Sequence, residues 1–156
     1  MKRSGGTACP TVMEAELQRK GAHALTLIAN RVKALGGKLR GSTVQIAQIR
    51  IGDTALFIAG INSSSGFNDE QRNELKRLGI VEVPTCVKGM TLKDGGAPHA
   101  EENMAAYIHE HGGRGLRWSY AVVGGLYDTK RGSRSYVCPT CRAMVERVGG
   151  VIEPPF

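Results

Sequence analysis

The run ALFIAGI at residues 55–61 is the stretch of sequence that decides the fold. A nearly continuous apolar run of this length is typical of a β-strand buried on both faces. A second strand pattern precedes it at residues 44–51, and the Gly-Asp pair at 52–53 between them is a tight-turn signal. We therefore predict a hairpin whose second strand is central. The apolar alternation of the first strand slips near residues 47–48, which suggests a bulge.

Helical patterns flank this hairpin on both sides. Residues 12–35 predict an amphipathic helix that breaks near Gly21, since apolar side chains recur every three or four positions. A capped helix is predicted from Asn68 to Leu78, with Gly79 as its stop. An extended segment is predicted at 80–83, and Pro84 limits it to an edge strand or a loop. The remaining predicted elements are a helix from His99, a buried strand at 120–123, a Gly-rich loop at 124–137, a helix from Cys138 to about Val148 and a short strand at 151–152.

This alternation of helices and buried strands predicts the fold class. We expect an α/β protein, a three-layer α/β/α sandwich around a mixed sheet of four to five strands. The strand after the His99 helix should run parallel to the strand after the Cys138 helix. One domain is expected over residues 1–156, because a chain of this length can bury a single core.

The net charge of +7 is unevenly distributed along the chain. Residues 1–50 hold nine Lys and Arg against two Glu, whereas residues 51–156 hold twelve basic and twelve acidic residues. The chain has no apolar run of the roughly 18 residues that a membrane-spanning helix needs, and its first residues do not fit the pattern of a secretory signal. Four cysteines, two of them in one motif, favour a reducing compartment over a disulfide framework.

Two short motifs carry the candidate chemistry. The motif HAE at residues 99–101 places a histidine two positions before a glutamate, and CPTC at residues 138–141 supplies two thiolates. One imidazole and two thiolates can hold zinc and leave its fourth position open for water. A glutamate beside such a metal moves protons rather than binding it. We therefore expect a catalytic zinc site with His99, Cys138 and Cys141 as ligands and Glu101 as the catalytic residue.

The spacing of the second motif suits the start of a helix. Cys138 and Cys141 would share one face of that helix, and Pro139 fits its first turn, where a missing N–H costs nothing. The helix dipole favours thiolates at this position. Two alternatives remain open from the residues alone: a structural zinc site completed by Cys86 or Cys9, and a redox-active dithiol.

A basic and aromatic stretch lies between the two motifs. Basic side chains for a phosphate backbone, with aromatic rings for stacked bases, are typical of a surface that binds single-stranded nucleic acid. The alternatives are a solvated face above core aromatic residues, or a face that binds an acidic protein. The basic members are Arg114, Arg117, Lys130, Arg131 and Arg134, and the aromatic members are Trp118, Tyr120, Tyr127 and Tyr136.

With these motifs in this order, the chain resembles the cytidine deaminase superfamily. The resemblance covers nearly the whole chain: leading helix, hairpin, HAE helix, strand and CPTC helix. Within that superfamily it is most similar to the deaminase domains of bacterial polymorphic toxins, in particular those that act on cytosine in single-stranded DNA. Two departures stand out. Proline follows the first cysteine instead of preceding it, and only about four of the usual five strands are clear from the sequence.

The resemblance implies a reaction and a set of roles. Zinc would lower the pKa of its water towards about 7, and the resulting hydroxide would attack C4 of cytosine. Glu101 would take a proton from that water, deliver it to the ring nitrogen and help ammonia leave. Asn62 would contact the sugar or base, although a turn-forming role is the alternative for it. The candidate substrate-binding residues are Asn62, Ser63, Ala100, Trp118, Arg134 and Tyr136.

The expected function is therefore zinc-dependent deamination of cytosine to uracil in single-stranded DNA. As a toxin domain, the protein would act in the cytoplasm of a recipient bacterial cell, and its producer would need a cognate acidic immunity protein. Single-stranded nucleic acid is the expected substrate, and no membrane is expected as a partner. The alternatives are deamination of free nucleosides, nucleotides, RNA or adenine, and a non-catalytic zinc domain that binds nucleic acid.

Overall fold

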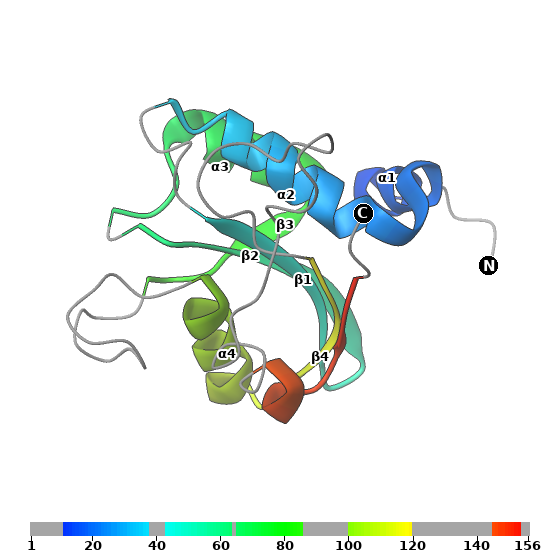
Figure 1. Cartoon of the computed structure of the whole chain (residues 1–156). Helices are drawn as coiled ribbons and strands as arrows, with labels where there is room; N and C mark the ends of the chain where they lie inside the picture. Colours follow the sequence, from blue (N-terminus) through cyan, green and yellow to red (C-terminus); the bar gives the residue numbers. More distant parts are fainter. Residues whose placement is uncertain (1–10, 38–42, 64, 86–99, 120–144, 154–156) are drawn as a thin grey trace, which may run out of the picture.

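The computed structural model describes residues 11–37, 43–63, 65–85, 100–119 and 145–153. Five strands in these ranges form one mixed sheet in the order β3-β2-β1-β4-β5, with helices on both of its faces (Figure 1). The predicted three-layer α/β/α sandwich is confirmed. Its elements are α1 (Val12–Lys20), the 3₁₀ turn η1 (Gly21–His23), α2 (Ala24–Ala34), β1 (Val44–Ile51), β2 (Thr54–Ile61), α3 (Asp69–Leu78), β3 (Ile80–Glu82), α4 (Ala100–Glu110), β4 (Arg114–Trp118) and β5 (Val151–Ile152).

The helix boundaries follow local signals. The leading helical segment divides into α1 and α2 at Gly21, whose φ of 69° lies in the left-handed region that favours glycine. The side chains of Asn68 and Gln71 form a capping box with the backbone at the start of α3, and Gly79 ends that helix with a φ of 75°. Within the described ranges, no helix combines the length and the apolar character needed to cross a membrane.

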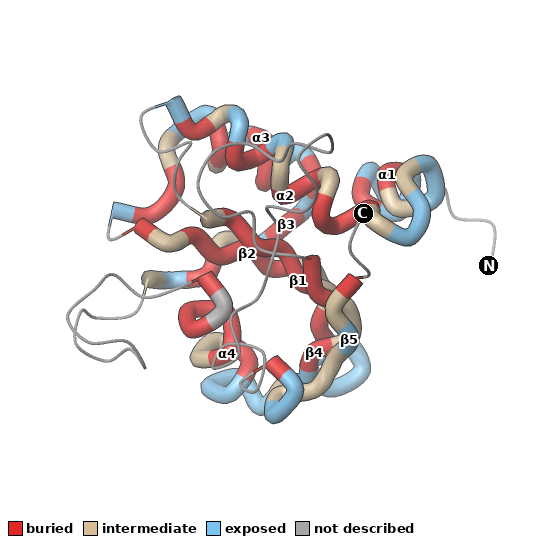
Figure 2. Tube along the Cα trace, in the orientation of Figure 1, coloured by how far each residue is buried: buried red, intermediate tan, exposed pale blue. Residues whose placement is uncertain are grey.

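The central hairpin is confirmed, and its pleat explains the slip in apolar alternation. The strands β1 and β2 pair antiparallel without interruption along their whole length. Val44 and Ile46 belong to the core shared with α1, α2 and α3, whereas Ala47 and Ile49 belong to the core shared with α4. Residues of β1 are buried on both faces of the sheet (Figure 2). Apolar side chains can therefore lie on either face, and the slip in apolar alternation requires no bulge in β1 itself.

The bulge lies in the strand next to β1. Gln48 is opposite Arg117 and Ile49 is opposite Gly115, so Leu116 is an extra residue in β4. The predicted position along β1 was close, but the prediction assigned the bulge to the wrong strand. Backbone crowding also marks this part of β4, since a Cβ on Gly115 would lie 2.2 Å from the carbonyl oxygen of Gly149.

Both edge strands run parallel to their neighbours. β3 pairs with β2, so the extended segment before Pro84 joins the sheet and supplies its fifth strand. β4 pairs with β5, which confirms the predicted parallel pairing of the strands that follow the two motif helices. The strand after α4 is Arg114–Trp118, which the sequence did not predict. The predicted strand at 120–123, the loop at 124–137 and the first half of the CPTC helix lie outside the described residues.

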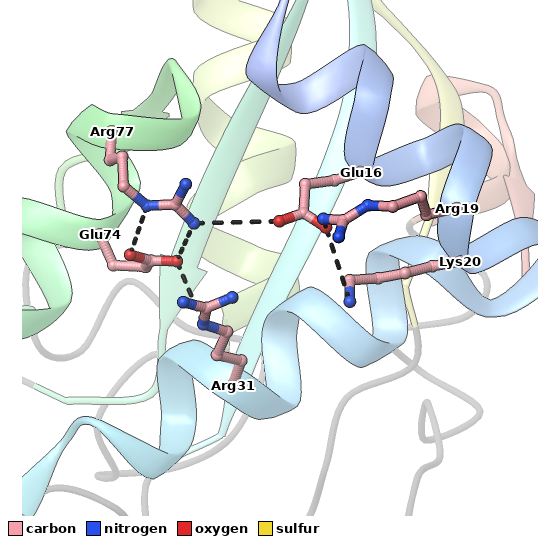
Figure 3. Close-up of polar contacts among 6 residues, drawn as sticks. All are labelled: Glu16, Arg19, Lys20, Arg31, Glu74 and Arg77. Carbon is pink, nitrogen blue, oxygen red and sulfur yellow. Dashed lines mark hydrogen bonds and ion pairs between the residues drawn. The ribbon is translucent and has the colours of Figure 1, made fainter.

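Charged side chains join the three helices on one face of the sheet (Figure 3). Glu74 of α3 accepts a hydrogen bond from Arg77 at 2.6 Å and pairs with Arg31 of α2 at 3.2 Å. Glu16 of α1 pairs with Arg77 at 3.9 Å, which connects α1 to α3. The hydrogen bonds from Arg77 lower the pKa of the Glu74 carboxyl below its ordinary value. Arg19 and Lys20 are further partners of Glu16.

Glu153 ties the end of the sheet to the start of α2. Its carboxylate accepts hydrogen bonds from the backbone N–H groups of Leu25 at 2.9 Å and Thr26 at 2.8 Å, and from the Thr26 hydroxyl at 2.6 Å. It also pairs with Arg117 of β4 at 2.9 Å. His23, which precedes α2, provides no side-chain cap. The buried carboxylate of Glu153 therefore satisfies helix N–H groups that would otherwise lack partners.

Candidate functional site

The structure describes part of the predicted site. Ala100 is the first residue of α4, and the backbone at residue 101 is helical, so the residue predicted to be catalytic lies in the first turn of this helix. Among the described residues, no three His, Cys, Asp or Glu side chains form a group that could hold a metal ion, and this has no bearing on ligands elsewhere in the chain. The predicted residues outside the described ranges are His99, Cys138, Cys141, Arg134 and Tyr136.

The start of α4 is packed tightly against the end of β2. Ala100 is fully buried, and its carbonyl oxygen would lie 2.8 Å from a Cβ placed on Gly60. Met104 Cγ would lie 2.9 Å from the same Cβ. One turn further on, the buried Asn103 side chain donates from Nδ2 to the carbonyl of Ile61 at 3.2 Å. These contacts place the first turn of α4, which includes the predicted catalytic residue, at the carboxyl end of β2.

Two predicted substrate contacts lie at the same edge. Asn62 directly follows β2, is half-buried, and donates from its backbone N–H to the carbonyl of Thr43 at 2.9 Å. Ser63 is buried, and its carbonyl accepts a hydrogen bond from the Thr85 hydroxyl at 3.3 Å. The structure thus brings Asn62, Ser63 and Ala100 together at one edge of the sheet, and their contact with a substrate stays a prediction.

Gln45 of β1 and Ser119 after β4 complete this edge, and sequence reasoning missed both. Gln45 lies opposite Gly60, so its side chain is on the face that α4 covers. Its Nε2 donates to the carbonyl of Ser119 at 2.7 Å, and the Ser119 hydroxyl accepts from the backbone N–H of Ile46 at 2.9 Å. No sequence signal separates Gln45 from Gln48, because either glutamine fits the solvent-facing side of an alternating strand.

The side-chain oxygen of Gln45 stands out at this edge. Gln45 is fully buried, and within the described ranges its Oε1 is the buried side-chain polar atom that has no hydrogen-bond partner. The orientation of the amide is fixed, because exchanging its two ends would point Oε1 at the carbonyl oxygen of Ser119. A buried acceptor without a partner costs about 1–3 kcal/mol, so native proteins rarely keep one without a reason.

The described members of the basic and aromatic stretch lie apart from this edge or are engaged elsewhere. Trp118 is fully buried in the core beneath α4, and its Nε1 donates to the carbonyl of Gly149 at 3.2 Å. Arg117 is held by Glu153 on the opposite face. Arg114 is exposed at the amino end of β4, away from the candidate site. These contacts favour structural roles for Trp118 and Arg117, and base stacking by Trp118 stays a prediction.

Comparison with known proteins identified no relative of this chain. No protein-family model matches this chain, and neither a curated protein nor a solved structure matches it. The resemblance to deaminases therefore rests on the two motifs and on the order of the elements that carry them. What the geometry adds is a carboxyl edge at which a buried helix start meets polar groups from β1, β2 and β4, and ligands of α/β sheets bind at such edges.

Proposed function

We propose that this chain is a zinc-dependent deaminase that converts cytosine to uracil in single-stranded DNA, and that it serves as an interbacterial toxin domain. The main support from the structure is the position of the first turn of α4. This turn carries Glu101 and lies at the carboxyl end of β2, next to Asn62 and Ser63. His99 directly precedes Ala100 in the sequence, so the proposal assigns both parts of the HAE motif to this edge.

The donor set of the two motifs fits zinc by its chemistry. One imidazole and two thiolates are ordinary zinc ligands, and three protein ligands are typical of catalytic rather than structural sites. The described part of the chain after β4 ends at Ser119, at the same carboxyl edge, and Cys138 and Cys141 follow it in the sequence. When bound, zinc would lower the pKa of a water molecule towards about 7 and so supply a nucleophile at neutral pH.

The side chains of this protein would then handle protons and hold the base. Glu101 would accept the proton of the water, pass it to N3 of cytosine and later protonate the departing amino nitrogen. Water adds at C4 and ammonia leaves, so the reaction needs no oxidant or reductant. Asn62 and Ser63 would contact the sugar or base at the mouth of the site, and the backbone of Ala100 would face the base.

Charge favours a polyanionic substrate over a free nucleoside. The chain carries a net charge of +7, which attracts a phosphate backbone, whereas a free nucleoside has no charge to be attracted. An acidic immunity protein would be attracted by the same charge, and action in the recipient cytoplasm belongs to the same proposal.

A substrate panel tests the proposal. Purified protein is incubated with single-stranded DNA, double-stranded DNA, RNA and free cytidine, and uracil and inosine are measured by mass spectrometry. We expect uracil in single-stranded DNA, no uracil with Glu101→Ala, and normal uracil formation with Glu110→Ala, which removes an exposed glutamate from the far end of the same helix.

Other outcomes would favour the alternatives. Uracil in RNA or free cytidine alone would keep the chemistry and change the substrate, and inosine would make adenine the target. Binding of single-stranded DNA without any deamination would leave a non-catalytic zinc domain as the function.

A further inference from the structure

Gln45 is buried at the candidate site, and the proposed function does not yet give it a role. Two features hold its side chain in one orientation: full burial, and the 2.7 Å hydrogen bond from Nε2 to the carbonyl of Ser119. The amide therefore cannot exchange its donor and acceptor ends to suit a ligand. It presents a fixed, uncharged acceptor on the α4 face, between Gly60 under the start of α4 and the end of β4.

A fixed amide oxygen has a narrow choice of partners. It accepts a hydrogen bond from an N–H or O–H group, and it repels another carbonyl oxygen. The C4 substituent of cytosine is an amino group with two N–H donors, whereas the same position of uracil is a carbonyl oxygen. An acceptor aimed at this substituent would therefore bind the substrate and disfavour the product.

We infer that Gln45 is a specificity-determining residue whose Oε1 accepts a hydrogen bond from the exocyclic amino group of the target base. The inference rests on the proposed deaminase function. Gln45 distinguishes substrate from product at the reacting carbon, and it promotes release of the deaminated base. It does not separate cytosine from adenine, because both carry an exocyclic amino group at the position that reacts.

Binding measurements with matched oligonucleotides test this role. Zinc-loaded Glu101→Ala protein, which should not turn over, is titrated with two single-stranded oligonucleotides that differ only in one dC or dU. We expect the dC strand to bind about tenfold more tightly than the dU strand. The amino group of dC gains one hydrogen bond to Gln45, whereas the carbonyl oxygen of dU makes one repulsive contact there. Adding Gln45→Met, which keeps the length but removes both polar atoms, should bring the two affinities within about twofold.

A matched control separates this effect from a general loss of packing. Gln48→Met makes the same chemical change in the same strand, but its side chain faces the other side of the sheet, and the tenfold preference should remain. Thermal unfolding of each variant shows how much of any affinity loss comes from instability. If Gln45→Met does not fold, Gln45→Asn provides the test, since the shorter amide cannot reach both partners at once.

The outcomes separate the two proposals. If the wild-type protein makes uracil but the dC-to-dU ratio is unchanged by Gln45→Met, the inference is wrong and Gln45 is only structural. A hydrogen bond from Oε1 to another part of the chain or to a water would give that result. If the wild-type protein makes no uracil, the proposed function fails and the inference fails with it.

Discussion

The two faces of the sheet are stabilised by different means. On the face covered by α1, α2 and α3, buried carboxylates are matched by cations or helix N–H groups, as at Glu16, Glu74 and Glu153. The face covered by α4 is mainly apolar, and its buried amide at Gln45 keeps one acceptor without a partner among the described residues. Under the proposed function, the first face serves stability, whereas the second accepts a cost in stability because it holds the proposed site.

The largest expected effect on stability is at Glu153. Glu153→Ala leaves Arg117 without its counterion and two N–H groups of α2 without acceptors, so we expect a loss of about 3–5 kcal/mol in the free energy of unfolding. Urea unfolding measures this loss. Because Glu153 lies on the face covered by α1, α2 and α3, away from the proposed site, deamination per folded molecule should stay normal. The milder Thr26→Val removes one hydroxyl bond and should cost about 1 kcal/mol. A large drop in activity per folded molecule would show that the two faces are not separate.

A smaller loss of stability with a larger loss of activity is expected at Gly60. Gly60→Ala places a methyl group 2.8 Å from the Ala100 carbonyl, so α4 must move away from β2. We expect a cost of about 1–3 kcal/mol, together with a fall in kcat/KM that exceeds the loss of folded protein.

The other end of α4 provides the control for this change. Gly113→Ala creates a comparable steric clash at the edge away from the site, because its Cβ would lie 2.9 Å from the carbonyl oxygen of Arg50. It should cost similar stability and leave activity per folded molecule unchanged. Equal activity losses in both variants would contradict the assignment of the site to the edge near Gly60.

The smallest effect is a change in acid stability at Glu74. Hydrogen bonds from Arg77 lower the pKa of this carboxyl from its ordinary value of 4.5, so its stabilising contribution is present above that pH and is lost as the pH falls through the lowered folded pKa. Glu74→Gln should therefore be less stable than wild type at pH 7 and should lose less stability on acidification below pH 4.5. Thermal unfolding from pH 7 to pH 3 measures both, with the exposed Glu70→Gln as control. If wild type and Glu74→Gln lost the same stability between pH 7 and pH 3, the ion pair of Glu74 would contribute nothing to stability.

Most of the fold could be predicted because its signals are local. The capping box at Asn68, the break at Gly21 and the turn between the hairpin strands each depend on a few adjacent residues. The strand β4 was missed because RGLRW lacks the apolar run that marks a buried strand. Its pairing depends on distant contacts, such as the close approach of Gly149 to Gly115, and these are invisible in a single sequence.

The candidate site was predictable only where its chemistry has a motif. Asn62, Ser63 and Ala100 could be placed because they adjoin a predicted strand or the HAE motif. Gln45 could not, because its importance depends on burial, on its register opposite Gly60 and on the carbonyl of Ser119. These facts follow from the pairing of β1 with two other strands, which the sequence does not encode locally.

Zinc content and uracil formation, measured on the same preparations of wild-type and Glu101→Ala protein, test the proposed deaminase most directly. If the HAE and CPTC motifs form a catalytic zinc site, both proteins hold about one zinc ion per chain, and only the wild type makes uracil in single-stranded DNA. Equal uracil formation by the two proteins, or zinc-loaded wild type that deaminates no base in any substrate, would contradict it.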